Sequence, residues 1–121
     1  MTLREKLKVS RVLPVVTAED VDSTVKLAMA LQRGGMTSIE ITLRTASAMD
    51  AIVAVKQQVP GLLVAAGTVN TPAELEQVVD AGVELALSPG ATSTLLKEAA
   101  KAPLDFVPGV ASASEVMNAL D

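Results

Sequence analysis

The segment Ile39–Arg44 combines ionisable side chains with the pattern of a β-strand. Apolar and polar residues alternate along it, so Glu40, Thr42 and Arg44 share one face of the predicted strand. The neighbouring segments are typical of buried parallel strands, and charged groups directed into a protein interior are costly unless they are paired or used. The pattern therefore predicts a functional site. The alternative is an edge strand with one wet face, where the same residues form a weak surface ion pair.

The composition limits the chemistry that such a site can perform. The chain has 121 residues and contains neither histidine nor cysteine. This excludes the usual general base, thiolate catalysis and the commonest metal ligands. A buried carboxylate with a raised pKa is then the natural group for proton transfer, and Glu40 is the best candidate.

Arg44 lies four residues beyond Glu40 on the same face. In a continuous strand the two residues would be about 13 Å apart at ~3.3 Å per residue, which is too far for an intimate ion pair. The spacing suits an arginine that binds a substrate carboxylate or phosphate. A salt bridge at the end of a loop is the alternative for Arg44.

Charge and hydropathy exclude several classes of partner. The net charge is −4 with no basic cluster, and Phe106 is the single aromatic residue. Nucleic-acid and anionic-membrane partners are therefore not expected. Met1–Ser10 lacks the apolar region of a secretory signal, and no apolar run approaches the roughly 20 residues of a membrane span. We expect one domain over residues 1–121, located in the cytoplasm.

Five short apolar segments predict strands, and a segment with helical apolar spacing follows each of them. The predicted strands are Val12–Val16, Ile39–Leu43, Leu62–Ala66, Leu85–Ser88 and Phe106–Val107. The first predicted helix covers Glu19–Arg33 and the last begins near Ser112. Thr71-Pro72 supplies an N-cap followed by proline in the first turn, and Ser112 with Glu115 matches a capping box.

Alternating strands and helices predict an α/β fold with a parallel sheet, in one of two architectures. One is a flavodoxin-like open sheet, in which strand one lies between strands two and three. The other is the first five βα units of a (β/α)8 barrel, in which the strands keep sequential order. The polar mid-strand residues Glu40 and Thr42 and the small residues Ala65 and Ala66 favour the barrel, whose interior can hold polar catalytic groups.

Both architectures bind ligands at the carboxyl ends of the strands. The candidate residues there are Thr17, Arg44-Thr45, Gly67-Thr68-Val69-Asn70, Ser88-Pro89-Gly90 and Pro108-Gly109. For any one of these segments, an ordinary βα loop is the alternative. None matches a phosphate loop or dinucleotide fingerprint, so no nucleotide site is predicted. The six lysines all fall outside the predicted strands and are expected to be solvated helix charges.

Taken together, these segments resemble a known family in their order and spacing. The motifs are Gly34-Gly35, Ile39–Thr45, Ala66-Gly67-Thr68-Val69, Ser88-Pro89-Gly90 and Val107-Pro108-Gly109-Val110. From about Val12 to its last residue, the chain resembles the N-terminal portion of the 2-keto-3-deoxy-6-phosphogluconate aldolase and 4-hydroxy-2-oxoglutarate aldolase family. The resemblance implies a cytoplasmic, homotrimeric class I aldolase on a (β/α)8 barrel. It implies no metal and no organic cofactor, with pyruvate or another 2-oxo acid as the small-molecule partner.

The resemblance also implies roles for individual residues. Glu40 matches the general acid/base, and Arg44 matches the residue that binds the pyruvate carboxylate. Thr68 and Pro89 match residues that line the pyruvate pocket. The family's Schiff-base lysine lies on a sixth strand, so its equivalent would follow Asp121.

We therefore expect that residues 1–121 alone do not form the Schiff base. We also expect an open five-stranded piece to self-associate or to belong to a longer chain, because its edges and apolar interior face are exposed. A non-catalytic half-barrel that binds oxo-acids or serves assembly, and a flavodoxin-like binding domain, are the alternative functions.

Overall fold

Five parallel β-strands form a single sheet in the computed structural model, which describes residues 1–121. The strands are β1 (Val15–Thr17), β2 (Ser38–Thr42), β3 (Leu63–Gly67), β4 (Leu85–Ser88) and β5 (Asp105–Pro108). They follow the order β1-β2-β3-β4-β5. This sequential order excludes the flavodoxin-like arrangement and confirms the predicted fold, five βα units of the (β/α)8-barrel type.

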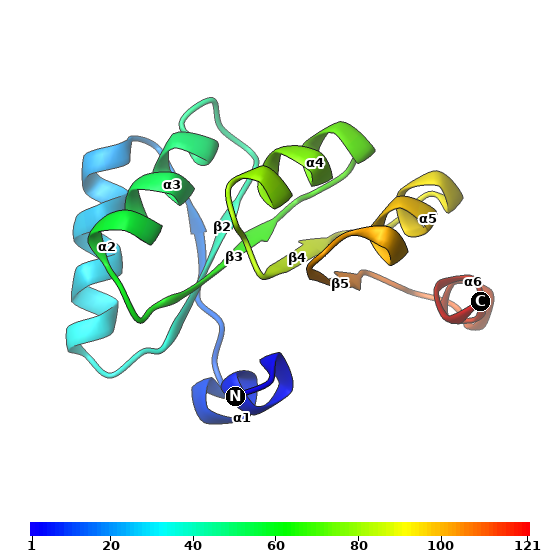
Figure 1. Ribbon diagram of the computed structural model, residues 1–121, viewed down its shortest axis with the longest axis horizontal. Coiled ribbons are helices and arrows are strands. Elements are labelled where there is room, and N and C mark those ends of the chain that lie inside the picture. The colour runs from blue at the N-terminus through cyan, green and yellow to red at the C-terminus, as the bar shows by residue number, and fades with distance from the viewer.

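Helices α2 to α5 lie along one face of the sheet, and α6 follows β5 at the C-terminal end (Figure 1). The helices are α1 (Leu3–Ser10), α2 (Val21–Arg33), α3 (Ala48–Gln58), α4 (Pro72–Asp80), α5 (Ser93–Lys101) and α6 (Ala113–Leu120). The predicted caps of α4 and α6 are present: the Thr71 and Ser112 hydroxyls accept hydrogen bonds from the backbone N–H groups of Glu74 and Glu115. A helix long and apolar enough to cross a membrane is not found.

The hydrophobic core fills the space between the sheet and its helices and is almost entirely aliphatic. Ile39 and Ile41 of β2 pack there against side chains such as Ile52 and Val55 of α3, and all four are fully buried. Glu40, which lies between Ile39 and Ile41, therefore faces the opposite side of the sheet, as the alternating pattern predicted.

On that opposite face, strand register aligns side chains in rows that cross the sheet. One row runs through Val15, Glu40, Ala65, Leu85 and Asp105. Val15 and Asp105, at the two edges of the sheet, are exposed, whereas Ala65 and Leu85 in the middle are buried. Glu40 thus belongs to the face that lines the interior of a barrel.

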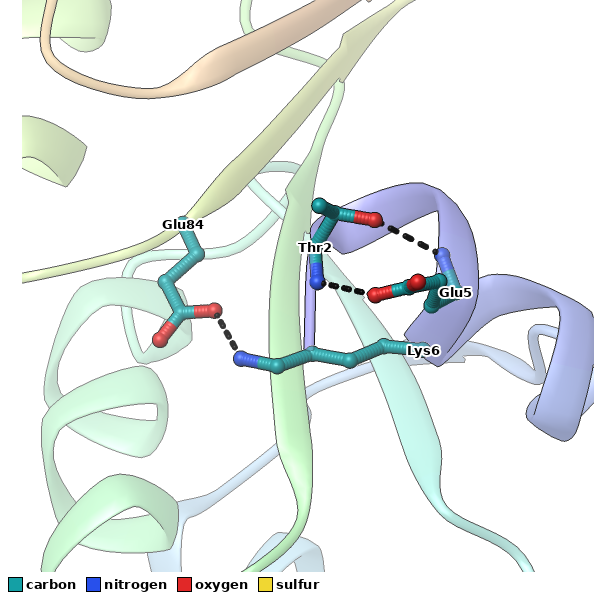
Figure 2. Close-up of polar contacts among 4 residues, drawn as sticks. All are labelled: Thr2, Glu5, Lys6 and Glu84. Carbon is teal, nitrogen blue, oxygen red and sulfur yellow. Dashed lines mark hydrogen bonds and ion pairs between the residues drawn. The ribbon is translucent and has the colours of Figure 1, made fainter.

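The N-terminal helix α1 was not predicted from the sequence, where Met1–Ser10 was noted only for lacking the apolar region of a secretory signal. Thr2 and Glu5 form a capping box at its start, a short-range signal that the sequence carries (Figure 2). Figure 2 also shows Lys6 reaching from α1 to Glu84, with 2.9 Å between Nζ and Oε2. Because Glu84 directly precedes β4, α1 lies at the amino-terminal ends of the strands, away from the predicted site.

Several predicted element boundaries were wrong by one to three residues. The first strand covers Val15–Thr17 where Val12–Val16 was predicted, and β3 extends to Gly67. The second strand stops at Thr42, before Leu43 and Arg44, which lie in a turn. This last difference changes the position of Arg44 and is taken up below.

Candidate active site

Glu40 lies in the middle of β2, which is paired on both sides, with Val15 of β1 and Ala65 of β3 as its register partners. The edge-strand interpretation is therefore wrong. The Glu40 side chain is half-buried and has no hydrogen-bond or ion-pair partner in the chain. Burial raises the pKa of Glu40 above its ordinary value, and the charge of Arg44 lowers it by a smaller amount. An unpaired carboxyl group with a raised pKa is suited to proton transfer.

The Glu40 side chain leans along the sheet toward the carboxyl ends of the strands. Its carboxyl group does not lie over its register partner Ala65 but against Gly67, two residues further along β3. The side chain is therefore directed along the sheet toward the strand ends rather than straight across to β3. A mid-strand residue thereby reaches the edge where the predicted substrate-binding residues lie.

Arg44 lies in the turn after β2, where its side chain is exposed and has no ion-pair partner. The separation expected for a continuous strand does not apply, because the strand ends two residues earlier. Arg44 and Glu40 do not form a salt bridge, but the Arg44 charge acts on the pKa of Glu40. Thr45 fixes the turn, since its hydroxyl donates a hydrogen bond to the Ala18 carbonyl in the loop after β1.

Thr68, which directly follows β3, has a left-handed backbone conformation with φ of 57°. Such a conformation costs a non-glycine residue about 1–3 kcal/mol, and residues of this kind cluster at active sites and ligand clamps. The Thr68 side chain is half-buried, and its hydroxyl makes no hydrogen bond within the chain. The Thr68 hydroxyl, which can both donate and accept a hydrogen bond, is therefore free at the strand end next to Gly67.

Pro89 follows β4 and is exposed at the same edge of the sheet. Gly109, after β5, packs directly against its backbone: a Cβ atom on residue 109 would overlap the Pro89 carbonyl oxygen and lie 2.6 Å from the carbonyl carbon. The Gly109 N–H also donates to the Ser88 carbonyl at 2.8 Å. Gly109 thus determines where the Pro89 loop lies.

Backbone hydrogen bonds continue beyond the strands and connect these loops. Leu43 donates to the Gly67 carbonyl at 2.9 Å, and Val69 donates to the Leu87 carbonyl at 3.0 Å. Because β2, β3 and β4 are neighbours, Arg44, Thr68 and Pro89 lie at the carboxyl ends of adjacent strands, the edge toward which the Glu40 carboxyl group is directed.

Sequence reasoning noted Gly67, Thr45 and Gly109 only as members of loop segments. No local pattern signals their contacts, which are made across strands.

None of the six lysines lies on a strand, as the sequence predicted, and all six lie on helices, with Lys6 and Lys8 on the unpredicted helix α1. No group of three or more His, Cys, Asp or Glu side chains is placed to hold a metal ion. A hollow of about 490 Å³ lies at the opposite, amino-terminal end of the sheet, where Lys6, Lys56 and Glu84 contribute to its lining. It contains none of the four predicted site residues.

Comparison with known proteins agrees with this geometry. The family model for KDPG and KHG aldolase matches residues 3–121. The chain belongs to this aldolase family. The resemblance drawn from the five motifs is thereby confirmed.

Individual relatives show how much of a family member's length this chain covers. It is 42% identical over 110 residues to the KHG/KDPG aldolase of Escherichia coli strain K12, an alignment that covers 91% of this chain and 52% of the relative. It is 39% identical over 121 residues to the 2-dehydro-3-deoxy-phosphogluconate aldolase of Treponema pallidum, covering 100% of this chain and 58% of the relative. The chain therefore spans about half the length of the curated relatives it matches.

A solved structure gives the corresponding similarity in three dimensions. The KDPG aldolase of Legionella pneumophila, described with pyruvate captured as a covalent carbinolamine intermediate, superposes with a TM-score of 0.92 at 38% identity. The superposition covers 99% of this chain and 58% of the Legionella chain. The five βα units thus have the arrangement found in a complete member of the family.

Proposed function

We propose that this chain forms the amino-terminal part of a class I aldolase that cleaves 2-keto-3-deoxy-6-phosphogluconate, 4-hydroxy-2-oxoglutarate or both, to pyruvate and an aldehyde. Family membership supports the reaction class. The names of the relatives support both substrates, and the pyruvate carbinolamine of the Legionella enzyme supports covalent chemistry on pyruvate. The homotrimer and the cytoplasmic location implied by the resemblance belong to the same proposal.

The observation that carries the proposal is the state of Glu40. A half-buried carboxyl group with a raised pKa and no partner can accept a proton and return it without first breaking an internal ion pair. In the proposed cleavage, Glu40 takes the proton of the substrate's 4-hydroxyl as the carbon–carbon bond breaks. It then helps to protonate the three-carbon fragment that becomes pyruvate.

Arg44, Thr68 and Pro89 are assigned to substrate binding. The exposed, unpaired guanidinium of Arg44 can form a bidentate pair with the pyruvate carboxylate. The free hydroxyl of Thr68 can hydrogen-bond to the substrate, and Pro89 supplies a rigid apolar wall. The strained backbone of Thr68 supports its assignment to the site.

The Schiff-base nucleophile is assigned to a lysine outside residues 1–121. The six lysines of the chain all lie on helices, and none lies on a strand that lines the barrel interior, where a Schiff-base lysine would be desolvated. In the proposal, residues 1–121 supply the acid/base Glu40 and the residues that bind the pyruvate carboxylate, and a further segment supplies the amine of the Schiff-base lysine.

The test is the intact mass of the purified protein after incubation with pyruvate and borohydride. The 121-residue chain has a mass of 12.4 kDa and should carry no reduced pyruvate adduct. A longer polypeptide containing these residues should carry one adduct. An adduct on the 12.4 kDa chain, or none on an active longer polypeptide, would contradict the assignment of the nucleophile.

A non-catalytic half-barrel is the second candidate, and the helical placement of all six lysines favours it. The Glu40→Gln variant of the longest available polypeptide separates the two candidates. An aldolase should lose about 10²- to 10⁴-fold in kcat when its acid/base is removed. A half-barrel that only binds oxo-acids has no kcat to lose, and its pyruvate affinity should depend on Arg44 instead.

A further inference from the structure

The Glu40 carboxyl group occupies the space where residue 67 would have a side chain. A Cβ atom on Gly67 would overlap Oε1 of Glu40 and would lie 2.9 Å from its Cδ and 3.1 Å from its Cγ. These are the three nearest atoms to that position, and all belong to Glu40. Gly67 itself is buried.

The backbone at residue 67 does not require glycine. Positive φ angles occur at Gly35, Gly61 and Gly82, but not at Gly67, which has strand conformation in β3. An alanine could adopt the same backbone conformation. The contact with Glu40 is therefore what a side chain at residue 67 would disturb.

We propose that Gly67 is a positioning residue for Glu40: by lacking a side chain, it lets the carboxyl group lie flat against β3 and reach the carboxyl edge of the sheet. This inference rests on the proposed function, because it gives the position of Glu40 a catalytic purpose. Without the space over Gly67, the side chain must turn away from β3 toward the open face. The proton-transfer group would then leave the strand ends where Arg44 and Thr68 lie.

The clash would involve only the flexible end of a side chain. An alanine at residue 67 can therefore be accommodated by rotation of Glu40, with no displacement of a strand. Gly67→Ala should leave the fold intact and change the position of the acid/base, so positioning and folding can be measured separately.

The experiment compares Gly67→Ala with Gly34→Ala in the longest native polypeptide that contains these residues. Gly34 is exposed at the end of α2, has φ of −77°, and a Cβ atom there would make only ordinary 3.5 Å contacts. Two readouts are used: kcat and KM for aldol cleavage across pH, and titration of the Glu40 carboxyl carbon by NMR with labelled glutamate.

For Gly67→Ala we expect kcat to fall about 100-fold, within the range contributed by general acid–base catalysis, while KM changes less than about threefold. The pKa of Glu40 should move down toward its ordinary value as the carboxyl group enters solvent. Gly34→Ala should match the wild type in both readouts. Wild-type kcat together with an unchanged Glu40 titration in Gly67→Ala would overturn the proposal.

A double-mutant cycle with Glu40→Ala tests the contact itself. Alanine lacks the Cγ, Cδ and Oε1 atoms that lie against residue 67, so Gly67→Ala should cost little further activity in the Glu40→Ala background. Equal losses in both backgrounds would overturn the proposal. If Gly67→Ala unfolds, a folded double variant supports the contact, whereas unfolding of both overturns it.

Failure of the proposed function can be told apart from failure of this inference. If the wild type shows no aldol cleavage, the proposed function fails. The NMR titration still decides whether Gly67 positions Glu40, because a merely structural glycine would leave the titration of Glu40 unchanged.

Discussion

The contact between Gly109 and Pro89 predicts a large effect for a single added methyl group. In Gly109→Ala the new Cβ atom would overlap the Pro89 carbonyl oxygen, lie 2.6 Å from the Pro89 carbonyl carbon and lie 3.0 Å from the Ser88 carbonyl oxygen. These are backbone atoms, so rotation of a side chain cannot relieve the clash. The end of β5 must move away from the loop after β4.

The change in the free energy of unfolding combines two destabilising terms and one smaller stabilising term. Overpacking a rigid site destabilises by about 1–3 kcal/mol. Separation of the two segments also weakens the 2.8 Å hydrogen bond from Gly109 to Ser88, and such a bond contributes about 0.5–1.5 kcal/mol. Replacing glycine restricts the unfolded chain and returns about 0.4–1 kcal/mol. We therefore expect the free energy of unfolding to fall by about 0.5–4 kcal/mol.

Urea denaturation measures this change. With a slope of about 2 kcal/mol per molar urea, the midpoint should fall by roughly 0.25–2 M. Gly90→Ala is the matched control, because Gly90 lies next to Pro89 but a Cβ atom there would have no neighbour within 4 Å. Its midpoint should stay the same or rise slightly. Equal midpoints for the two variants would refute the argument that Gly109 fixes the loop.

Three further predictions concern stability. Burial raises the pKa of Glu40 above its ordinary 4.5. Between the unfolded and folded pKa values the folded chain therefore binds more protons than the unfolded chain, so the free energy of unfolding falls as pH rises and levels off above the folded pKa. The urea midpoint of the wild type should show this decline with pH, and the midpoint of Glu40→Gln should not. Ile52→Ala removes a fully buried core side chain of α3 and should cost about 2–5 kcal/mol in the same assay, and a cost below ~1 kcal/mol would contradict the packing described. Lys6→Ala breaks the pair with Glu84, whose side chains are 36% and 54% exposed, and should cost less than about 1 kcal/mol at low salt; a larger loss would mean that this pair is essential for holding α1.

Local patterns in the sequence predicted most of the secondary structure and the two charged residues of the candidate site, Glu40 and Arg44. Alternation along Ile39–Thr42 placed Glu40 on the face opposite the helices, and the structure agrees because side chains alternate strictly along a strand. The caps at Thr71 and Ser112 were readable because capping is made by residues three positions apart. The same kind of signal at Thr2 and Glu5 was present but was not used, and α1 was missed.

Contacts between strands were beyond the reach of such patterns. The sequence could propose Glu40 and Arg44, but not that β2 ends at Thr42 or that the Arg44 charge acts on the pKa of Glu40. It could not show that Thr68 adopts a left-handed conformation, since threonine rarely does so.

The sequence by itself determined the alternation of strands and helices, the polar face of β2 and the absence of histidine and cysteine chemistry. Only the tertiary structure decided the strand order, and with it the barrel-type architecture. It alone placed the Glu40 carboxyl group against Gly67 and the Pro89 backbone against Gly109. The physical reason is distance along the chain: spacing rules act within a turn or a strand, whereas these contacts join residues about twenty or more positions apart.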